Sequence, residues 1–540
     1  MLSRLLEPAF VVRTLAGAGL IRPERPDRLV RGLDALRRWG PTVAGGYAAA
    51  AIRHPDSVAL IDELGSLTFK QIDRRGNAVA RGLSARGVRP GDGVAILARN
   101  HRGFVDATVG VAKLGANALY LNTMFAAPQI AEVCAREQPV ALIHDQEFTG
   151  LVAAAAEGRE RVVAWSDEPD AAGAPTLEDL IEAHDGAPLQ PPGEPGRVVI
   201  LTSGTTGTPK GAQRKQPDSL APIAALLDAI PLRARGTTVI AAPMFHSWGM
   251  AHFLIGLSLG STLVVRRRFD AAATLGDIAA HGAQALAVVP MMLQRIMEAE
   301  AAELQSLDTS SLKTVAVSGS ALPGELALRV MDRFGPVLFN LYGSTEVAWA
   351  TIAGPADLRA APGTAGRPPR GTVVKLLGDD GREVQQGQTG RIFVGNEMAF
   401  DGYTGGGGKE VISGLMSTGD VGHLDAAGRL FVDGRDDEMI VSGGENVFPR
   451  EVEDLLADHP EIADVGVVGV PDEEWGQRLR AAVVLVGGAT VTEEDIQQYV
   501  RRNLARYKVP REVLFLDELP RNATGKVLKR VIAEDHPPSQ

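Results

Sequence analysis

The sequence predicts an α/β protein with more than one domain. From residue 55 to about 345, short apolar runs alternate with helical patterns. Many of these runs lack polar alternation, which is typical of strands covered on both faces, and the long connections between them indicate parallel sheets. A chain of 540 residues is also longer than one hydrophobic core supports, because single cores stop growing at roughly 250–300 residues.

The strands expected in this region are short. They are Val58–Ile61, Val94–Leu97, Val140–Ile143, Val198–Leu201, Val239–Ala242, Leu263–Val265, Ala287–Val289, Val315–Val317 and Val337–Leu341. From residue 370 to 435 we expect hairpins, because turn-forming residues at 378–381 and 425–428 separate short strands. After residue 437 the chain reads as a compact α+β stretch, long enough for a separate small domain.

Composition excludes several classes of protein. Hydrophobic residues at 45% and charged residues at 22% fit an ordinary globular protein, neither disordered nor a multi-span membrane protein. A net charge of −11 argues against general nucleic-acid binding. The single cysteine, Cys134, excludes an internal disulfide and a multi-thiolate metal site. It shares a helical apolar face with Ile130 and Val133, so we expect it in the core rather than as a nucleophile.

The charge is distributed unevenly along the chain. The first 40 residues carry eight arginines against four carboxylates, a net charge of +4 that leaves −15 for the rest. The apolar run from Leu5 to Ile21 is interrupted by Glu7, Pro8 and Arg13. It is therefore too short and too charged to span a bilayer, and it lacks the shape of a signal peptide.

A second helix is expected within this basic stretch. Leu29, Leu33 and Leu36 recur at helical spacing after Asp27, a residue suited to an N-cap, with arginines around them. Two interpretations fit this pattern. The helix lies on an anionic membrane surface, or it packs on its own domain.

A donor-rich loop directly follows the strand expected at Val198–Leu201. It carries glycines, hydroxyls and one lysine, and its backbone N–H groups and hydroxyls suit phosphate oxygens while Lys210 adds a point charge. It is not a Walker A loop, because Gly-x-x-x-x-Gly-Lys-Ser/Thr is absent. The residues expected to bind phosphate are Thr202, Ser203, Gly204, Thr205, Thr206, Gly207 and Lys210.

The string Thr202–Gly211 closely resembles the phosphate-binding signature of the adenylate-forming superfamily, which includes acyl-CoA synthetases, adenylation domains and luciferases. The resemblance extends from about residue 45 to 530. Asn340–Glu346 is similar to the family's Tyr-Gly-x-Thr-Glu motif, which implies that Thr345 contacts phosphate and that Glu346 helps to hold Mg²⁺.

Two further motifs imply a nucleoside site. Val317–Pro323 resembles the loop on which adenine rests, and Ser417–Asp420 resembles the Thr-Gly-Asp element whose carboxylate accepts hydrogen bonds from the ribose hydroxyls. Arg435 matches the family's ribose-facing arginine. The resemblance therefore implies an adenine and ribose site made by Gly319, Ser320, Ala321, Tyr342, Gly343, Asp420 and Arg435.

The C-terminal part resembles the family's moving domain. Asp437 occupies the hinge position, and Pro520–Lys526 resembles the loop whose lysine, here Lys526, enters the active site during adenylation. The segment Gly443, Gly444 and Glu445 resembles the loop that replaces it beside the thioester-forming centre. Pro243–Gly249 resembles the motif that places a histidine, His246, near the acyl site, although a buried structural histidine is the alternative.

The resemblance also implies the fold and its boundaries. A large N-terminal domain is expected to combine two stacked parallel-rich sheets and their helices with a small β-barrel-like subdomain, followed by a small mobile α+β domain. The expected parts are a basic extension (1–45), an AMP- and acyl-binding domain (46–436) and a lid domain (437–540) that carries the catalytic lysine.

The expected activity is that of an ATP-dependent fatty acyl-CoA synthetase acting on a medium- or long-chain acid. It would form acyl-AMP, release pyrophosphate and transfer the acyl group to coenzyme A, with Mg²⁺ as the metal. The apolar stretch Trp248–Leu257 is compatible with a wall for an aliphatic chain, and no basic cluster marks a charged substrate. We expect a cytoplasmic protein with small-molecule substrates and no nucleic acid. Peripheral contact with an anionic membrane through residues 1–40 is kept as an alternative to packing of that stretch on its own domain, and a homodimer is kept as an alternative to a monomer.

Other interpretations stay open at this stage. Within the ligases, they are an acyl-AMP ligase that loads a carrier protein and an aryl or other carboxylic acid–CoA ligase. Gly256–Gly260 matches the Gly-x-Ser-x-Gly of α/β-hydrolases, but a helical pattern precedes it and a strand follows, the reverse of the required context. The chain also departs from the family between Tyr403 and Ser417, where relatives have a longer link with Trp or Phe before Thr-Gly-Asp, and the run Gly405–Gly408 has no assigned role.

Overall fold

The fold is known from a computed structural model. It describes residues 2–168, 173–201, 211–214, 219–299, 306–378, 380–398, 400–404, 406, 408–436, 440–442, 445–472, 476–504, 506–522 and 525–534. The chain divides into two compact units. The first contains Met1–Val288, Met292–Ala316 and Met398–Gly408, and the second contains Val289–Met291, Val317–Glu397 and Lys409–Gln540.

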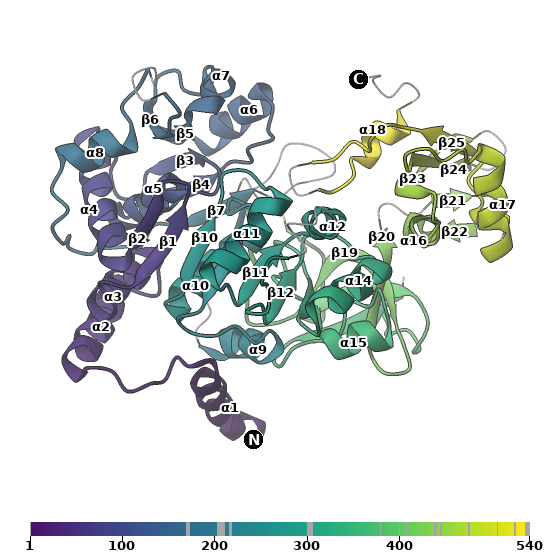
Figure 1. The fold of residues 1–540 in the computed structure, drawn as a ribbon, viewed down its shortest axis with the longest axis horizontal. Helices are drawn as coiled ribbons and strands as arrows, with labels where there is room; N and C mark the ends of the chain where they lie inside the picture. Colours follow the sequence, from purple (N-terminus) through teal and green to yellow (C-terminus); the bar gives the residue numbers. More distant parts are fainter. Residues whose placement is uncertain are drawn as a thin grey trace. The chain divides into compact units, whose positions relative to one another are not determined.

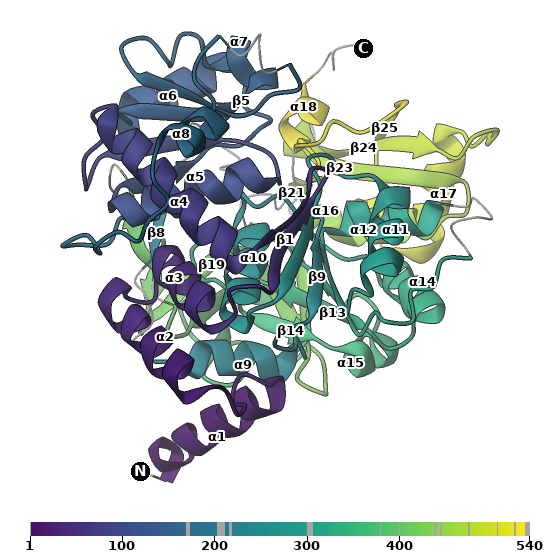
Figure 2. The ribbon, with the colours of Figure 1, turned by 60° about the vertical axis from the view of Figure 1, so that its left-hand side comes forward.

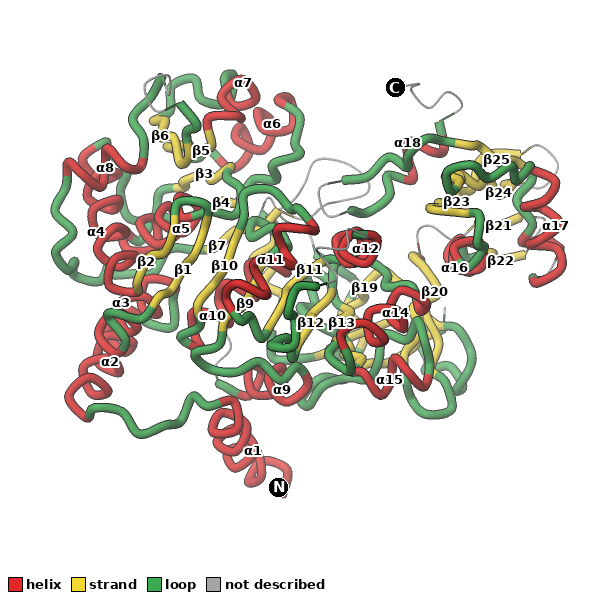
Figure 3. Tube along the Cα trace, viewed as in Figure 1, coloured by secondary structure: helices red, strands yellow, loops and turns green. Residues whose placement is uncertain are grey.

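The first unit alternates helices and strands, as Figure 3 shows in red and yellow. Its helices are α1 (Leu2–Ala18), α2 (Pro26–Trp39), α3 (Val43–Arg53), α4 (Phe69–Ala85), α5 (Arg102–Leu114), α6 (Ala127–Glu137), α7 (Thr149–Val152), α8 (Leu177–Ala183), α9 (Ala221–Ala229), α10 (Ser247–Leu259), α11 (Ala271–His281) and α12 (Pro290–Glu298), with a 3₁₀ turn at Gln146–Phe148. Its strands are β1 (Val58–Asp62), β2 (Gly65–Thr68), β3 (Gly93–Leu97), β4 (Asn117–Tyr120), β5 (Ala141–Asp145), β6 (Glu160–Trp165), β7 (Val198–Leu201), β8 (Gly211–Arg214), β9 (Thr237–Ile240), β10 (Thr262–Val265), β11 (Ala285–Val288), β12 (Thr314–Val317) and β17 (Phe400–Tyr403).

These strands form two parallel-rich sheets. One has the order β12-β11-β9-β10-β1-β2, in which β1 and β2 are antiparallel, and the other has the order β17-β8-β7-β4-β3-β5-β6, in which β8 runs antiparallel to both of its neighbours. Strands β3, β5, β11 and β12 are buried almost throughout, because helices cover both faces of a parallel sheet (Figure 1). Each predicted strand overlaps an observed one within a few residues. The expected α/β class with parallel-rich sheets is confirmed.

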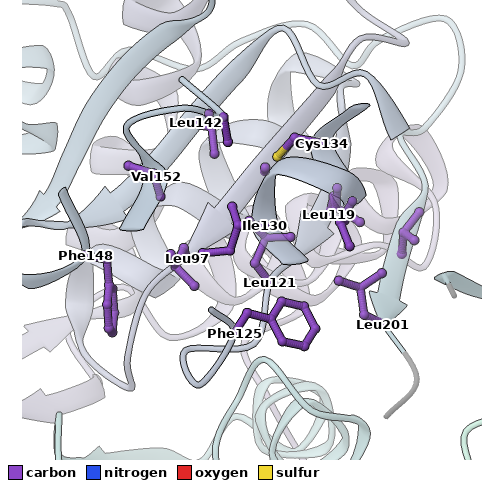
Figure 4. Close-up of a cluster of buried hydrophobic side chains, with 14 residues drawn as sticks. Leu97, Leu119, Leu121, Phe125, Ile130, Cys134, Leu142, Phe148, Val152 and Leu201 are labelled. Carbon is purple, nitrogen blue, oxygen red and sulfur yellow. The ribbon is translucent and has the colours of Figure 1, made fainter. Parts of the chain in front are cut away.

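The hydrophobic core on the sheet β17-β8-β7-β4-β3-β5-β6 includes the single cysteine. Cys134 lies on α6 and points into a cluster with Leu97, Leu121, Ile130 and Leu142, all fully buried (Figure 4). Burial raises the pKa of the Cys134 thiol to about 11. The interpretation of Cys134 as a core residue is therefore confirmed.

Helix α2 differs from the expectation in two respects. Helix α2 begins at Pro26 with Arg25 at the N-cap position, so Asp27 lies inside the first turn and is not the cap. The buried residues of α2 are Gly32 and Ala35, whereas Leu33 is 55% exposed. A Cβ added at Gly32 would lie 2.7 Å from the side chain of Arg53 on α3, so the small residues permit close packing of the two helices. Figure 2 shows α2 and α3 side by side.

The second unit contains two antiparallel-rich sheets and their helices. Its helices are α14 (Gly324–Phe334), α15 (Pro355–Ala360), α16 (Pro449–Ala457), α17 (Glu493–Asn503) and α18 (Lys529–Ala533), with a 3₁₀ turn at Arg506–Lys508. Its strands are β13 (Leu338–Tyr342), β14 (Thr351–Ala353), β15 (Val373–Leu377), β16 (Gly390–Gly395), β18 (Val411–Ile412), β19 (Leu415–Leu424), β20 (Leu430–Arg435), β21 (Ile440–Ser442), β22 (Glu445–Val447), β23 (Ile462–Asp472), β24 (Gly476–Leu485) and β25 (Glu512–Phe515).

The hairpins predicted between residues 370 and 435 are present. Strands β15, β16, β19 and β18 form an antiparallel sheet, with β20 paired to β19 through the predicted turn at 425–428. Farther along, β22, β21, β24 and β23 form a second sheet, to which β25 adds in parallel. Helices α16 and α17 contribute Val452, Leu456, Ile496 and Val500 to its core, so this C-terminal part is the α+β domain that was expected. In the described part of the chain, no helix is long and apolar enough to cross a membrane.

Candidate active site

Asp420 and Arg435 are brought together by the pairing of two strands. Asp420 on β19 lies directly opposite Arg435 at the end of β20. Across this antiparallel pair, Nη1 of Arg435 lies 3.5 Å from Oδ1 of Asp420, and both side chains are largely buried. The two residues that the resemblance assigns to the ribose are therefore neighbours through the register of a single hairpin.

Tyr342 holds the other oxygen of Asp420. Tyr342 ends β13, and its hydroxyl donates to Oδ2 of Asp420 at 2.5 Å while lying 3.2 Å from Oγ1 of Thr418. Burial and the adjacent carboxylate raise the pKa of Tyr342 well above its usual value. The phenol therefore stays protonated and keeps donating, so one oxygen of Asp420 is fixed and the Oδ1 side faces Arg435.

The electrostatics of Asp420 involve three cations. Burial raises the pKa of this carboxyl, and the hydrogen bond from Tyr342 and the charges of Arg435, Lys526 and Lys409 act in the opposite direction. Arg435 and Lys526 were expected at this site. Lys409 was not.

The loop that carries Lys526 is held by its own backbone. The N–H of Lys526 donates to Oδ1 of Asn522 at 3.0 Å, and the N–H of Asn522 donates to the carbonyl of Lys526 at 2.9 Å. Gly525 has φ 78°, a conformation that favours glycine, and a Cβ there would lie 2.8 Å from Met291. Arg521 anchors the start of the loop on Asp464 at 2.6 Å.

Glu346 lies in a tight loop between β13 and β14. A Cβ at Gly343 would lie 2.2 Å from the carbonyl oxygen of Ala348, so only glycine fits there. The Ser344 hydroxyl donates to Oε2 of Glu346 at 2.8 Å, and the N–H of Glu346 donates back to that hydroxyl at 3.2 Å. Glu346 is buried and Thr345 half-buried. A single oriented carboxylate fits Mg²⁺, which proteins usually hold through one or two carboxylates together with substrate phosphates.

The predicted adenine loop follows the buried strand β12. Gly319 has φ 102°, a conformation that favours glycine, and Ser320 and Ala321 are half-buried and exposed, respectively. Helix α14 begins three residues after Ala321, so the loop turns sharply between a strand and a helix.

His246 belongs to the first unit, at the N-cap position of α10. Burial lowers its pKa to about 4, so the imidazole is neutral at physiological pH. Its Nε2 lies 3.5 Å from Nδ2 of Asn122, which follows β4. Two residues after His246, the Trp248 indole donates to the carbonyl of Val288 at 3.0 Å. Its ring meets that of His252, one turn farther along α10, edge-on with the ring centroids 4.4 Å apart.

Several predicted site residues lie outside the described residues. They are Thr202, Ser203, Gly204, Thr205, Thr206, Gly207, Lys210, Asp437, Gly443 and Gly444. The flanks of the phosphate loop are described: β7 ends at Leu201, β8 begins at Gly211, and the Gly211 N–H donates to Oγ1 of Thr404 at 3.1 Å. Glu445 begins β22, where it pairs with Ser442.

The hydrolase alternative is excluded by the position of its serine. Ser258 lies inside α10, and its hydroxyl donates to the carbonyl of Leu254, one turn earlier, at 2.8 Å. A nucleophile elbow requires a serine on a sharp strand-to-helix turn.

Sequence reasoning missed the residues that orient the motif side chains. Ser344 fills the variable position of the Tyr-Gly-x-Thr-Glu motif and holds Glu346, and Thr418 lies beside the Tyr342 hydroxyl and accepts the N–H of Asp420 at 3.1 Å. A hydroxyl two residues before each carboxylate was the available signal, because Ser and Thr side chains bond to nearby backbone groups.

Comparison with known proteins decides the family. A family model described as AMP-binding enzyme matches residues 47–404, and one described as AMP-binding enzyme C-terminal domain matches residues 451–526. The chain belongs to the AMP-binding enzymes. The adenylate-forming resemblance is thereby confirmed, and ATP, Mg²⁺ and coenzyme A are the cofactors and substrates of this family's acid–CoA ligases.

The relatives of this AMP-binding enzyme include ligases of several acids. An indoleacetate–CoA ligase of Aromatoleum aromaticum is 35% identical over 89% of this chain and 93% of its own length. A feruloyl-CoA synthase of an Amycolatopsis species is 34% identical over 89% and 94%. A long-chain-fatty-acid–CoA ligase of Mycobacterium tuberculosis is 30% identical over 87% and 93%. Among solved structures, o-succinylbenzoate CoA synthetase of Bacillus subtilis, in complex with its acyl-adenylate, has a TM-score of 0.79 and 26% identity, covering 91% of this chain and 98% of that one.

Proposed function

We propose that this protein is an AMP-forming ligase that joins an aromatic or arylalkanoic carboxylic acid to coenzyme A. The observation that carries the adenylation step is the cluster of Tyr342, Asp420 and Arg435, with Lys526 close enough to influence Asp420. These groups suit the recognition of a ribose and an adjacent phosphate. The individual roles of the site residues, including those of the undescribed phosphate loop, are part of this proposal.

The choice of acid follows the relatives. The indoleacetate–CoA ligase and the feruloyl-CoA synthase are 35% and 34% identical to this chain, whereas the long-chain-fatty-acid–CoA ligase is 30% identical. The aryl alternative is thus better supported than the fatty acid expected from the sequence. Near His246, the half-buried Trp248 offers aromatic surface for a planar substrate, and the buried His252 packs edge-on against it.

The chemistry requires two steps because a carboxylate is a poor electrophile. In the first, an oxygen of the acid attacks the α-phosphorus of ATP, the bond to pyrophosphate breaks, and acyl-AMP forms. Two anions must approach each other, so alignment and charge stabilisation dominate the barrier. Asp420 and Arg435 would hold the ribose, and Lys526 would stabilise charge at the α-phosphate. Mg²⁺, held through Glu346, would neutralise charge on the departing phosphates.

In the second step the thiolate of coenzyme A attacks the acyl carbon, a C–S bond forms, and AMP leaves. His246 would lie near this step as a neutral imidazole, because burial lowers its pKa to about 4. It can then accept a hydrogen bond or a proton but adds no positive charge. Between the two steps, rotation at the hinge residue Asp437 would replace the Lys526 loop in the active site with the segment Gly443–Glu445.

A panel of acids tests this proposal. Pyrophosphate release should be measured with and without coenzyme A for indole-3-acetate, ferulate, benzoate, octanoate and palmitate. We expect the best aromatic acid to exceed both aliphatic acids in kcat/KM by about tenfold or more, since pocket shape discriminates at that scale. If none of these acids supports pyrophosphate release, the ligase assignment is contradicted.

A fatty-acid ligase is the second candidate. It is favoured by the apolar α10, where Met250, Phe253, Ile255 and Leu257 are buried, and by the 30% identical long-chain relative. Preference for palmitate over every aromatic acid in the same panel would select it. Pyrophosphate release without formation of any CoA thioester would instead select a ligase that loads a carrier protein.

A further inference from the structure

The segment just before the Thr-Gly-Asp element places an unassigned lysine at the nucleotide site. Strands β18 and β19 form a hairpin with Val411 opposite Met416 and Ile412 opposite Leu415. Its loop is the two residues Ser413 and Gly414, with φ of 51° and 79°, the left-handed pair of a tight hairpin turn. This is the stretch in which the chain departs from its relatives.

The register of this hairpin continues beyond β18. The N–H of Ser417 donates to the carbonyl of Glu410 at 2.9 Å, so Lys409 comes across from Thr418. Side chains alternate along a strand, so Glu410 and Lys409 point to opposite faces. Glu410 pairs with Arg391, which also holds Asp436 at 3.0 Å. Lys409 is left facing the Thr-Gly-Asp element.

Gly419 makes room for this lysine. Around the position that a Cβ of Gly419 would occupy, Nη2 of Arg435 lies at 3.3 Å and Nζ of Lys409 at 3.4 Å. Gly419 also has φ 81°, which a side chain would strain. Two cations thus converge over one glycine, beside the carboxylate of Asp420.

Three cations act on one carboxylate at this point. The charges of Arg435, Lys409 and Lys526 all lower the pKa of Asp420 against the effect of its burial. An ammonium group has donors but no acceptor, and it binds phosphate oxygens as a compact point charge. The phosphate of an adenylate is the anion that lies next to a ribose.

We propose that Lys409 is a further nucleotide-binding residue whose ammonium group binds the phosphate of the adenylate. This inference rests on the proposed function, because it takes Asp420 and Arg435 as the ribose site. The hairpin β18–β19 positions Lys409, and Gly419, which has no side chain, leaves room for its ammonium group.

Calorimetric titration of the full chain with AMP and with adenosine tests the inference. We expect Lys409→Met to weaken AMP binding by about tenfold, as the loss of one charge-assisted contact does. Adenosine binding should change by less than about twofold, because adenosine lacks the phosphate. Lys409→Arg keeps the charge and should restore most of the AMP affinity. Lys375→Met is the matched control, since Lys375 lies on β15 and pairs with Glu383 at 2.8 Å.

The outcomes separate two failures. If Lys409→Met weakens AMP and adenosine equally, or weakens neither, the phosphate contact is overturned while the proposed function stands. If the unmodified protein binds no AMP, the proposed function itself fails. Thermal unfolding of each variant confirms that it is folded before its affinities are compared.

Discussion

Two histidines, one at the N-cap of α10 and one within that helix, are buried where a charged imidazole is strongly disfavoured. Burial lowers the pKa of His246 and of His252 to about 4 in each case. His252 is 2% exposed, and among the described residues its Nε2 has no hydrogen-bond partner. A protonated His252 would therefore be a buried cation without compensation.

This burial predicts acid sensitivity. An unfolded histidine takes up its proton near pH 6.5, whereas folded His252 resists protonation until about pH 4, so stability is full above about pH 7 and falls as the pH drops toward 4. At pH 5, His252 should lower the free energy of unfolding by roughly 2 kcal/mol relative to pH 7.5. Urea unfolding at both pH values measures this difference.

The controls for this prediction use the same substitution at two sites. His252→Gln should reduce the loss of stability between pH 7.5 and pH 5. His281→Gln, at an exposed position in the last turn of α11, should leave that loss unchanged. An equal pH dependence in His252→Gln and the unmodified protein would show that His252 does not titrate as its burial implies.

Individual site residues were predictable where a motif fixes them. Asp420 and Arg435 were named from short signatures, and strand register brings them together. Lys409 could not be named in that way, because its position depends on a two-residue turn and on the free space at Gly419. The Ser-Gly dipeptide signals a turn, but it does not show which side chain the resulting strand register brings to Gly419.

The short apolar runs predicted most strands because buried parallel strands need no alternation. The amphipathic pattern of α2 was wrong for Leu33, which is exposed, whereas Leu29 and Leu36 are half-buried and the fully buried residues are Gly32 and Ala35. Close approach of α3 requires small residues there, and this tertiary requirement outweighs the leucine spacing. The membrane contact of residues 1–40 stays a prediction.

The hairpin β18–β19 offers a test that leaves Lys409 itself unchanged. Gly414→Val forces a branched side chain into φ 79°, at a cost of about 1–2 kcal/mol. The distorted turn should shift Lys409 and weaken AMP binding in the same direction as Lys409→Met. Calorimetric titration with AMP measures the effect.

Gly488→Val is the matched control for that variant. Gly488 has φ 88° in the turn after β24, and, as at Gly414, a Cβ there would meet no atom within 4 Å. The backbone strain is therefore comparable. If both variants weaken AMP binding equally, the effect of Gly414→Val is general destabilisation.

At the scale of the whole molecule, we expect Lys526 to act in adenylation but not in thioester formation. Lys526→Ala should lower acid-dependent pyrophosphate exchange by about 10²–10³-fold, because it removes charge stabilisation at the transition state. Thioester formation from pre-made acyl-adenylate should change little. Separate assays of the two half-reactions measure this.

Lys529→Ala is the control, three residues farther along, where the lysine pairs with Glu453 at 3.1 Å. An equal fall of both half-reactions in Lys526→Ala would remove Lys526 from the adenylation step. The boundaries at residues 45 and 436 also stay predictions, because sequence motifs locate a hinge more closely than they locate the extent of each packed body.

The burial of Cys134 has a practical consequence for fluorescence labelling experiments on this protein. Its thiol is fully enclosed and its raised pKa, about 11, leaves almost no thiolate at neutral pH. Maleimide reagents should therefore not react with Cys134 in the folded protein. Pairs of cysteines introduced on the surface can be labelled selectively in the natural background, so fluorescence energy transfer can report rearrangements of the C-terminal part during turnover.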